Sequence, residues 1–350
     1  MLAFAMILCS IAHATAATPV LNGAEHTKSL NPNETYNKII FTMTSSLSAF
    51  GSVAIIVTYF LWRDLRSTTR RILVYISIGD FFATYPSLII FWTKGYQINS
   101  FPCRLQSFIT STAIMWSFFW TTSLAIYLYI ALVKRRQDLS EKLMLTFHVV
   151  NWCLPILLVG GAWYEGRLGH TNSKSTAGWC WILIDKKEHK KAVIWMLICG
   201  KFWEIISYFV NGFLYFYITL KIKKEVLERM HLTSTNSVMI AERGRGKLTL
   251  VPLIFVVLRI WGTIRFLLFA FSADPPYLFK KIMLTLQLVG DNAQGITNFI
   301  LFCVFTEKFK QQIIRVFRIC NRRSQAGRLP ERGIRTTFSE DTRDNYKSYS

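Results

Sequence analysis

Apolar and polar positions along the chain are segregated into long blocks. Seven blocks hold about 20 or more mostly apolar residues, the length that an α-helix needs to cross about 30 Å of hydrocarbon. They lie at roughly 40–62, 71–93, 103–133, 142–163, 192–220, 248–272 and 279–305. The pattern therefore predicts an all-α membrane protein, built as a seven-transmembrane-helix bundle.

The segments outside the bundle at 40–305 are too short for a second folded domain, and nothing repeats at a fixed period. We expect an extracellular tail at 18–39, a short amphipathic helix on the cytoplasmic membrane surface at 306–320, and a disordered cytoplasmic tail at 321–350. The apolar face of the amphipathic helix comprises Phe309, Ile313, Val316, Phe317 and Cys320. Its last member, Cys320, is a candidate for palmitoylation.

The first 17 residues contain an apolar run that is too short to span a membrane, followed by Ala12, Ala14 and Ala16 in the spacing of a cleavage site. This pattern predicts a secretory signal peptide at 1–17. Because no Lys or Arg precedes the apolar run, a weakly hydrophobic N-terminal segment is the alternative interpretation.

Positive charge predicts the orientation. The chain is 52% hydrophobic yet carries a net charge of +21, and 26 of its 41 Lys and Arg residues fall on one set of loops and tail, against 11 on the other. The positive-inside rule then puts the N-terminus outside the cell and the C-terminus in the cytoplasm. The single acceptor triplet, at Asn33, falls on the glycosylatable side. Membrane lipids account for the basic segments, and no nucleic-acid partner is required.

Two of the seven cysteines, Cys103 and Cys180, face the oxidising side in this topology. The others lie in the signal, in spans or in the cytoplasm, as Cys9, Cys153, Cys199, Cys303 and Cys320. Only one pairing is then available, so we predict a disulfide that holds the second outer loop over the bundle. Trp179 and Trp181, which flank Cys180, are expected at the membrane interface or as the lid of a cavity; direct ligand contact is compatible with either place.

Several ordered stretches carry a family resemblance. They read WRDLRSTTRRILVYISIGD (62–80), SFFWTTSLAIYLYI (117–130), GWCWI (178–182), GKFWEIISY (200–208), LVPLIFVVLRIWGTIRF (250–266) and Gln294–Gly295. Together they resemble G-protein-coupled receptors of the slime-mould cyclic-AMP receptor-like group and its animal orphan relatives, over about 45–305. The Asp/Glu-Arg-Tyr and Asn-Pro-x-x-Tyr signatures of rhodopsin-like receptors are missing. The resemblance implies a plasma-membrane receptor that signals through a heterotrimeric G protein, and it names no ligand.

Polar residues at mid-membrane depth form one candidate site. Charge in hydrocarbon is costly, so each such residue is a functional candidate. The set is Asp80, Arg259, Asp291, Asn292, Gln294 and Asn298. We expect Arg259 to pair with Asp80 or Asp291. The network either holds the helices in register or acts as a switch whose pairing differs between resting and active states.

A second candidate site lies nearer the outer face. Lys201 and Glu204, spaced i, i+3, are expected to neutralise each other on one helix face. Arg265 has no such neighbour in sequence, and its guanidinium would suit an anionic ligand unless it reaches outward to headgroups. Arg104 is expected to extend to the interface. The candidate ligand-binding residues are Arg265, Gln287, Lys201, Glu204, Trp179 and Trp181.

Other protein classes fit less well. A retinal-binding receptor needs a lysine in the seventh span, which has none at 282–305, and a transporter usually shows internal symmetry. A membrane metalloenzyme needs several ligands, but His148 is the one histidine within a span. We therefore expect neither enzymatic activity nor a cofactor or metal. A non-signalling scaffold of the same fold is the alternative to a receptor.

The polar C-terminal tail carries hydroxyl side chains that are candidates for phosphorylation. They are Thr336, Thr337, Ser339 and Thr342. Phosphate there would provide a binding site for a regulator such as arrestin, although a solvated tail without that role has the same composition.

Overall fold

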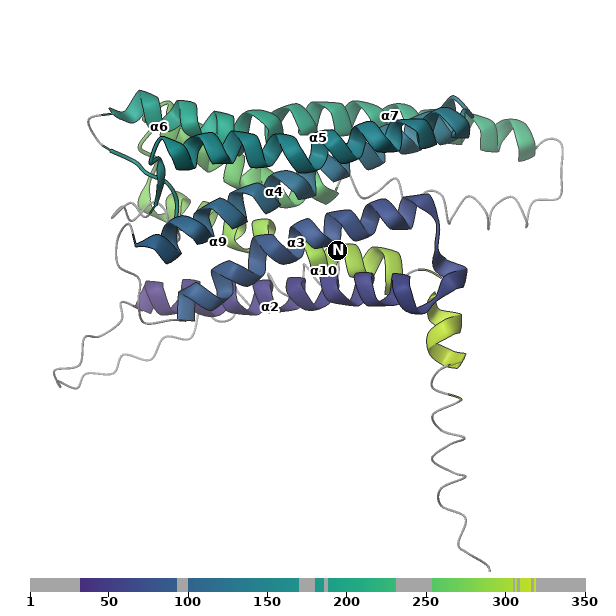
Figure 1. The fold of residues 1–350 in the computed structure, drawn as a ribbon, viewed down its shortest axis with the longest axis horizontal. Helices are drawn as coiled ribbons and strands as arrows, with labels where there is room; N and C mark the ends of the chain where they lie inside the picture. The colour runs from purple at the N-terminus through teal and green to yellow at the C-terminus, as the bar shows by residue number, and fades with distance from the viewer. Residues whose placement is uncertain are drawn as a thin grey trace, which may run out of the picture.

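The computed structural model describes residues 32–92, 100–169, 180–185, 188–230, 254–304, 306, 309–315 and 318. The predicted signal peptide, most of the predicted extracellular tail, Trp179, Cys320 and the polar C-terminal tail lie outside the described residues. Helices run side by side along the long axis of the molecule (Figure 1). One end carries a small β-hairpin and is called the hairpin end below; the other carries a short crossing helix and is called the tail end.

Within the described residues, five helical stretches are long and apolar enough to cross a membrane. They are α2 (Pro32–Leu61), α3 (Thr68–Trp92), α4 (Phe101–Leu128) with a π-helical turn (Tyr129–Val133), α5 (Gln137–Tyr164), and α6 (His189–Met196) joined to α7 (Phe202–Met230) by a π-helical turn (Leu197–Lys201). Two more helical stretches complete the bundle. They are the helix at 254–270, and α9 (Tyr277–Asn292) followed by α10 (Gln294–Phe299) and a π-helical turn (Ile300–Val304). The seven-helix fold predicted from the sequence is confirmed.

Helix ends differ from the apolar blocks because backbone hydrogen bonding continues beyond the hydrocarbon. The first helix begins at Pro32, about two turns before the predicted start, since proline is well suited to the first helical position. Asn33 therefore lies in the first turn of α2 instead of in an unstructured tail. In the same way α7 continues to Met230, well beyond the predicted end of the fifth span.

The hairpin end is held together covalently. Strand β1 (Leu168–Gly169) pairs antiparallel with β2 (Trp181–Ile182). A disulfide joins Cys103, near the start of α4, to Cys180, with 5.7 Å between the Cα atoms. Ser107 on α4 also donates a hydrogen bond to the carbonyl of Trp181 at 2.9 Å. The hairpin is thereby fixed against α4.

Ion pairs flank the hairpin. Glu188 accepts hydrogen bonds from Lys191 at 2.5 Å and from Arg167 at 2.8 Å. These two donors lower the pKa of Glu188 below its usual range. The contacts link the start of β1 to the turn before α6.

Close packing between α3 and α4 determines where their polar residues meet. A Cβ atom at Gly79 would lie 2.8 Å from the backbone nitrogen of Ser117, so the absence of a side chain lets the two helices touch. The next residue, Asp80, is therefore adjacent to Ser117. Large apolar side chains, among them Phe118 and Trp120, fill the core on either side of this contact.

At the tail end the helix at 309–315 crosses the axes of the bundle (Figure 1). Phe309 is buried, with its ring edge-to-face against Trp62 at 5.2 Å between centroids. Gln312 donates a hydrogen bond to Asp64 at 3.0 Å. Phe309, one residue of the predicted apolar face, therefore packs on the bundle.

Candidate functional site

A cavity of about 190 Å³ lies toward the hairpin end, between α3, α4, α7, the helix at 254–270 and α9. Its wall is mostly apolar, as is usual for small-molecule sites. The polar and aromatic residues of the wall include Lys201, Glu204, Arg259, Arg265, Gln287, Asp291 and Trp181. All the predicted ligand-binding residues that the structure describes therefore line one cavity.

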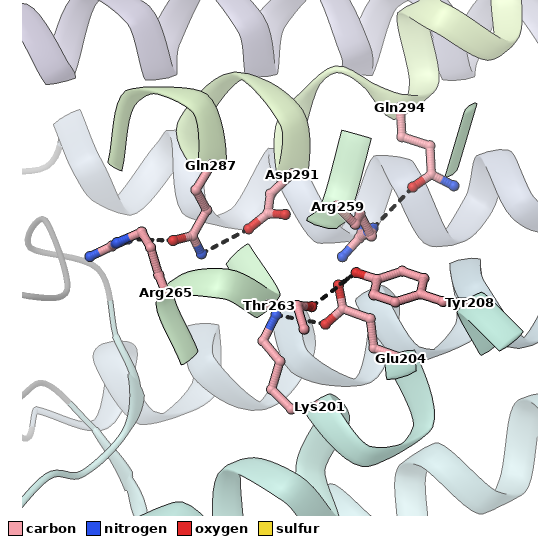
Figure 2. Close-up of polar contacts among 9 residues, drawn as sticks. All are labelled: Lys201, Glu204, Tyr208, Arg259, Thr263, Arg265, Gln287, Asp291 and Gln294. Carbon is pink, nitrogen blue, oxygen red and sulfur yellow. Dashed lines mark hydrogen bonds and ion pairs between the residues drawn. The ribbon is translucent and has the colours of Figure 1, made fainter. Parts of the chain in front are cut away.

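Lys201 and Glu204 form the ion pair expected from their spacing. Lys201 Nζ lies 2.6 Å from Glu204 Oε2, and both side chains are nearly buried. The other carboxylate oxygen accepts a hydrogen bond from the hydroxyl of Tyr208 at 2.7 Å, and this hydroxyl lies 3.0 Å from Thr263 Oγ1 (Figure 2). The pair is thereby connected from α7 to the helix at 254–270. It occupies the cavity wall and is internally neutral.

Arg265 points inward, toward α9. It donates a hydrogen bond to Gln287 Oε1, and Gln287 Nε2 donates to Asp291 Oδ2 at 3.0 Å (Figure 2). We call this chain the Arg265 relay. Gly262 makes room for it, because a Cβ atom there would lie 3.1 Å from Gln287 Nε2 and 3.2 Å from Asp291 Oδ2.

A second chain of hydrogen bonds leads from the cavity into the centre of the bundle. Arg259 Nε donates to Gln294 Oε1 at 3.1 Å, and Gln294 Nε2 donates to Ser117 Oγ at 2.9 Å. Ser117 Oγ donates to Asp80 Oδ1 at 2.6 Å, and Asn298 Nδ2 donates to Asp80 Oδ2 at 3.1 Å. We call this chain the Arg259 relay. All five side chains are buried, and they join α3, α4, the helix at 254–270 and α10.

The expected ion pair of Arg259 with an aspartate is wrong. Arg259 contacts Gln294, which separates it from Asp80, while Asp291 belongs to the Arg265 relay. The helix is interrupted between α9 and α10 at Ala293, whose φ and ψ are −88° and 0°. Gln294, the first residue after this interruption, is the one that contacts the guanidinium.

Two other candidates lie apart from both relays. Asn292 accepts a hydrogen bond from Ser45 on α2 at 3.2 Å and also lines the cavity. Arg104 does not line the cavity, and its guanidinium lies 5.1 Å from the centroid of the Trp163 ring near the end of α5. Trp181 lines the cavity, and Trp179 lies outside the described residues.

Sequence reasoning missed the neutral members of these chains. Ser117, Tyr208 and Thr263 are hydroxyl residues of ordinary type in membrane helices, so their polarity alone did not distinguish them. Gln106 on α4 was also missed; it is buried in the cavity wall and donates to Ser87 at 2.8 Å. Gln106 could have been identified from the sequence because it is a long amide side chain within an apolar span.

Charge is balanced across the site. The buried or half-buried cations are Lys201, Arg259 and Arg265, and the carboxylates are Glu204, Asp80 and Asp291. Lys201 contacts Glu204 directly, whereas hydrogen bonds connect Arg259 to Asp80 through Gln294 and Ser117. Gln287 connects Arg265 to Asp291. Indirect pairing of this kind leaves a hydrogen-bonding arrangement that a ligand can change by competing for one donor.

Comparisons with known proteins agree with this fold. The family model described as 7 transmembrane receptor (Secretin family) matches residues 35–297. The human protein named G-protein coupled receptor 157 is 32% identical over 293 residues, which cover 81% of this chain and 84% of that protein. Cyclic AMP receptor 1 of Dictyostelium discoideum is 22% identical over 152 residues, which cover 43% of this chain and 37% of that protein.

The crystal structure of squid rhodopsin is similar in fold, with a TM-score of 0.63 and 16% identity, over 87% of this chain and 92% of that one. At this identity the similarity concerns the fold alone. The family model and the human relative identify receptors and not enzymes, and they confirm the resemblance seen in the sequence. The chain therefore belongs to the seven-transmembrane G-protein-coupled receptors and is a multi-pass membrane protein related to G-protein coupled receptor 157.

Proposed function

We propose that this receptor lies in the plasma membrane with its N-terminus outside, binds an extracellular ligand in the cavity and activates a heterotrimeric G protein. The distribution of Lys and Arg supports the orientation. The observation that carries the proposal is the double role of Arg259, which lines the cavity and begins the relay to Asp80. Cavity and bundle centre thus share one side chain.

The ligand site comprises Lys201, Glu204, Arg265 and Gln287, with the disulfide-anchored hairpin above it. Trp181, and Trp179 by its place in the sequence, serve as the lid. Arginine in an apolar wall favours a ligand with an acidic group, because carboxylates and phosphates accept paired N–H donors. The small volume favours a small molecule.

Activation works through the Arg259 relay. A ligand group that accepts hydrogen bonds from Arg259 competes with Gln294 for the guanidinium. Gln294 is then free to reorient, and the support that Ser117 and Asn298 give to Asp80 changes with it. Because the relay links α3, α4 and α10, the ligand shifts the balance between two helix arrangements.

The cytoplasmic side provides the partner surfaces. Basic inner segments attract acidic lipids, palmitoylation of Cys320 anchors the surface helix, and phosphorylation of the tail at Thr336, Thr337, Ser339 or Thr342 recruits arrestin. Asn33 carries the glycan, and the segment at 1–17 is removed as a signal peptide.

The test is guanine-nucleotide exchange in cell membranes that contain the full chain, measured separately with each class of G-protein α subunit. The control is the same membranes without the chain. Exchange above the control with at least one class supports the receptor. Exchange equal to the control with every class, for protein shown at the cell surface by labelling, favours the scaffold.

A further inference from the structure

Two charged side chains in the cavity wall retain hydrogen-bonding atoms that have no partner among the described residues. Within the described part of the chain, Arg259 makes one hydrogen bond, from Nε to Gln294, so its two Nη groups donate to no side chain or carbonyl. Asp291 Oδ2 accepts from Gln287, but Oδ1 is buried and has no partner among the described residues. The Nη groups of Arg259 are cationic donors, and Oδ1 of Asp291 is an anionic acceptor.

Such atoms are costly to leave unpaired away from water. Arg259 is only 3% exposed, and its guanidinium lies 5.7 Å from the centroid of the Phe255 ring, which supplies no hydrogen-bond acceptor in the plane of the group. In Figure 2 the side of the guanidinium away from Gln294 faces the space between Asp291 and Glu204. The unpaired atoms of Arg259 and Asp291 therefore face the cavity, where one ligand that bonds to both would satisfy them.

The balance of charge restricts what this ligand can be. The site already holds three cations and three carboxylates, so a ligand with a net negative charge would leave a buried excess of one charge. A ligand with one acidic and one basic group adds no net charge and pairs with both unpaired atoms. A purely anionic ligand satisfies Arg259 and leaves Asp291 Oδ1 unpaired.

We propose that the cavity binds a small zwitterion, whose acid group accepts hydrogen bonds from the Nη atoms of Arg259 and whose ammonium group donates to Asp291 Oδ1. Free amino acids and similarly sized amino acid derivatives belong to this class and suit a volume of about 190 Å³. The inference rests on the proposed ligand-binding function. Binding can be measured without a G protein, so the two proposals can fail independently.

The experiment uses the purified full chain in lipid nanodiscs and measures its thermal unfolding midpoint as a function of added compound. The probes are the L-α-amino acids and, for each, the matching amine without the carboxyl group and the N-acetylated acid without the ammonium group. A compound that binds the folded receptor raises the midpoint. At least one amino acid is expected to do so at about tenfold lower concentration than either of its matched derivatives, because each lost charged pair weakens binding.

Two substitutions assign the groups. Asp291→Asn removes the partner of the ammonium group, so the amino acid and its N-acetylated acid should then raise the midpoint at the same concentration. Arg259→Gln removes the partner of the acid group, so the amino acid and its amine should then act at the same concentration. Gly262→Ala, which retains every charge, should weaken amino acid binding by crowding Gln287 and Asp291. The matched control Gly212→Ala, where nothing lies within 4 Å of the added Cβ atom, should bind as the unsubstituted chain does.

Three results would overturn the inference: no amino acid shifts the midpoint, the N-acetylated acid acts at the same concentration as the free amino acid, or the shift survives Asp291→Asn and Gly262→Ala unchanged. If nucleotide exchange is nevertheless observed in membranes, the receptor function stands and only the ligand class is wrong. If zwitterions bind and no exchange occurs with any G protein, the ligand class stands and the signalling function is wrong.

Discussion

Ser117 offers the sharpest test of the Arg259 relay. This fully buried hydroxyl donates to Asp80 at 2.6 Å and accepts from Gln294 at 2.9 Å. Ser117→Ala removes both bonds with little change of volume. The carboxylate then has one donor fewer, and the amide N–H of Gln294 has no acceptor.

The expected cost follows from these two bonds. Interhelical hydrogen bonds in membrane proteins contribute about 0.6 kcal/mol on average and about 1.7 kcal/mol at most. Bonds to charged groups contribute about 1.5–3 kcal/mol. Since one of the two lost bonds ends on a carboxylate, we expect Ser117→Ala to lower the free energy of unfolding by about 2–4 kcal/mol.

Two buried thiols provide the assay. Cys199 and Cys303 are 2% and 1% exposed, whereas Cys153 is exposed. The fluorescence that a maleimide dye gains on heating, above the level set by Cys153 in the unheated chain, therefore reports the unfolding of the purified chain. Ser117→Ala should lower the midpoint by about 3–5 °C at a fixed heating rate. The matched control is Ser77→Ala, since Ser77 is equally buried and its hydroxyl has no hydrogen-bond partner among the described residues. Equal midpoints for both variants would refute the relay as a stabilising element.

Three further outcomes are expected. Cys103→Ser and Cys180→Ser should each lower stability by about 4 kcal/mol, the cost of opening a loop closed over 77 residues, and the double variant should be no worse than either, as measured by the same thermal assay. Gly79→Ala should destabilise the bundle by about 1–3 kcal/mol by forcing α3 from α4, whereas Gly212→Ala in open space should not. The lowered pKa of Glu188 means that its contribution is present above about pH 4.5 and is lost as the pH falls through the lowered value. The protection of amides in 180–185 against hydrogen exchange, measured relative to their intrinsic exchange rates, should therefore fall at acid pH, and Glu188→Gln should abolish that dependence.

The helices were predictable because the membrane imposes a length on every apolar span. The length of the apolar spans did not predict the rotation of each helix or the break within the seventh span. Depth along a helix was readable from position, but rotation was not, since one residue turns a helix by about 100°. The break at Ala293 was not signalled by the apolar pattern. Arg259 contacts Gln294, the residue after the break, in place of the expected Asp80 or Asp291.

Part of the cavity wall was also predictable from the sequence. Lys201, Glu204, Arg265 and Gln287 were identified because charge and long amides are conspicuous in apolar spans, and the structure brings all four to one wall. Ser117 was not identified, because serine is common in membrane helices and its importance comes from a close helix contact. That contact depends on a glycine of α3, whose effect is visible only in three dimensions.

If Gln294 couples the cavity to the centre of the bundle, its removal should change basal nucleotide exchange. The comparison is between the unsubstituted chain, Gln294→Leu and Ser77→Ala, at equal surface amounts and with the G protein that responds best. We expect Gln294→Leu to change the basal exchange rate about fivefold or more, in line with coupling energies of about 1–3 kcal/mol, and Ser77→Ala to leave it unchanged. Equal exchange rates for all three proteins would contradict this coupling.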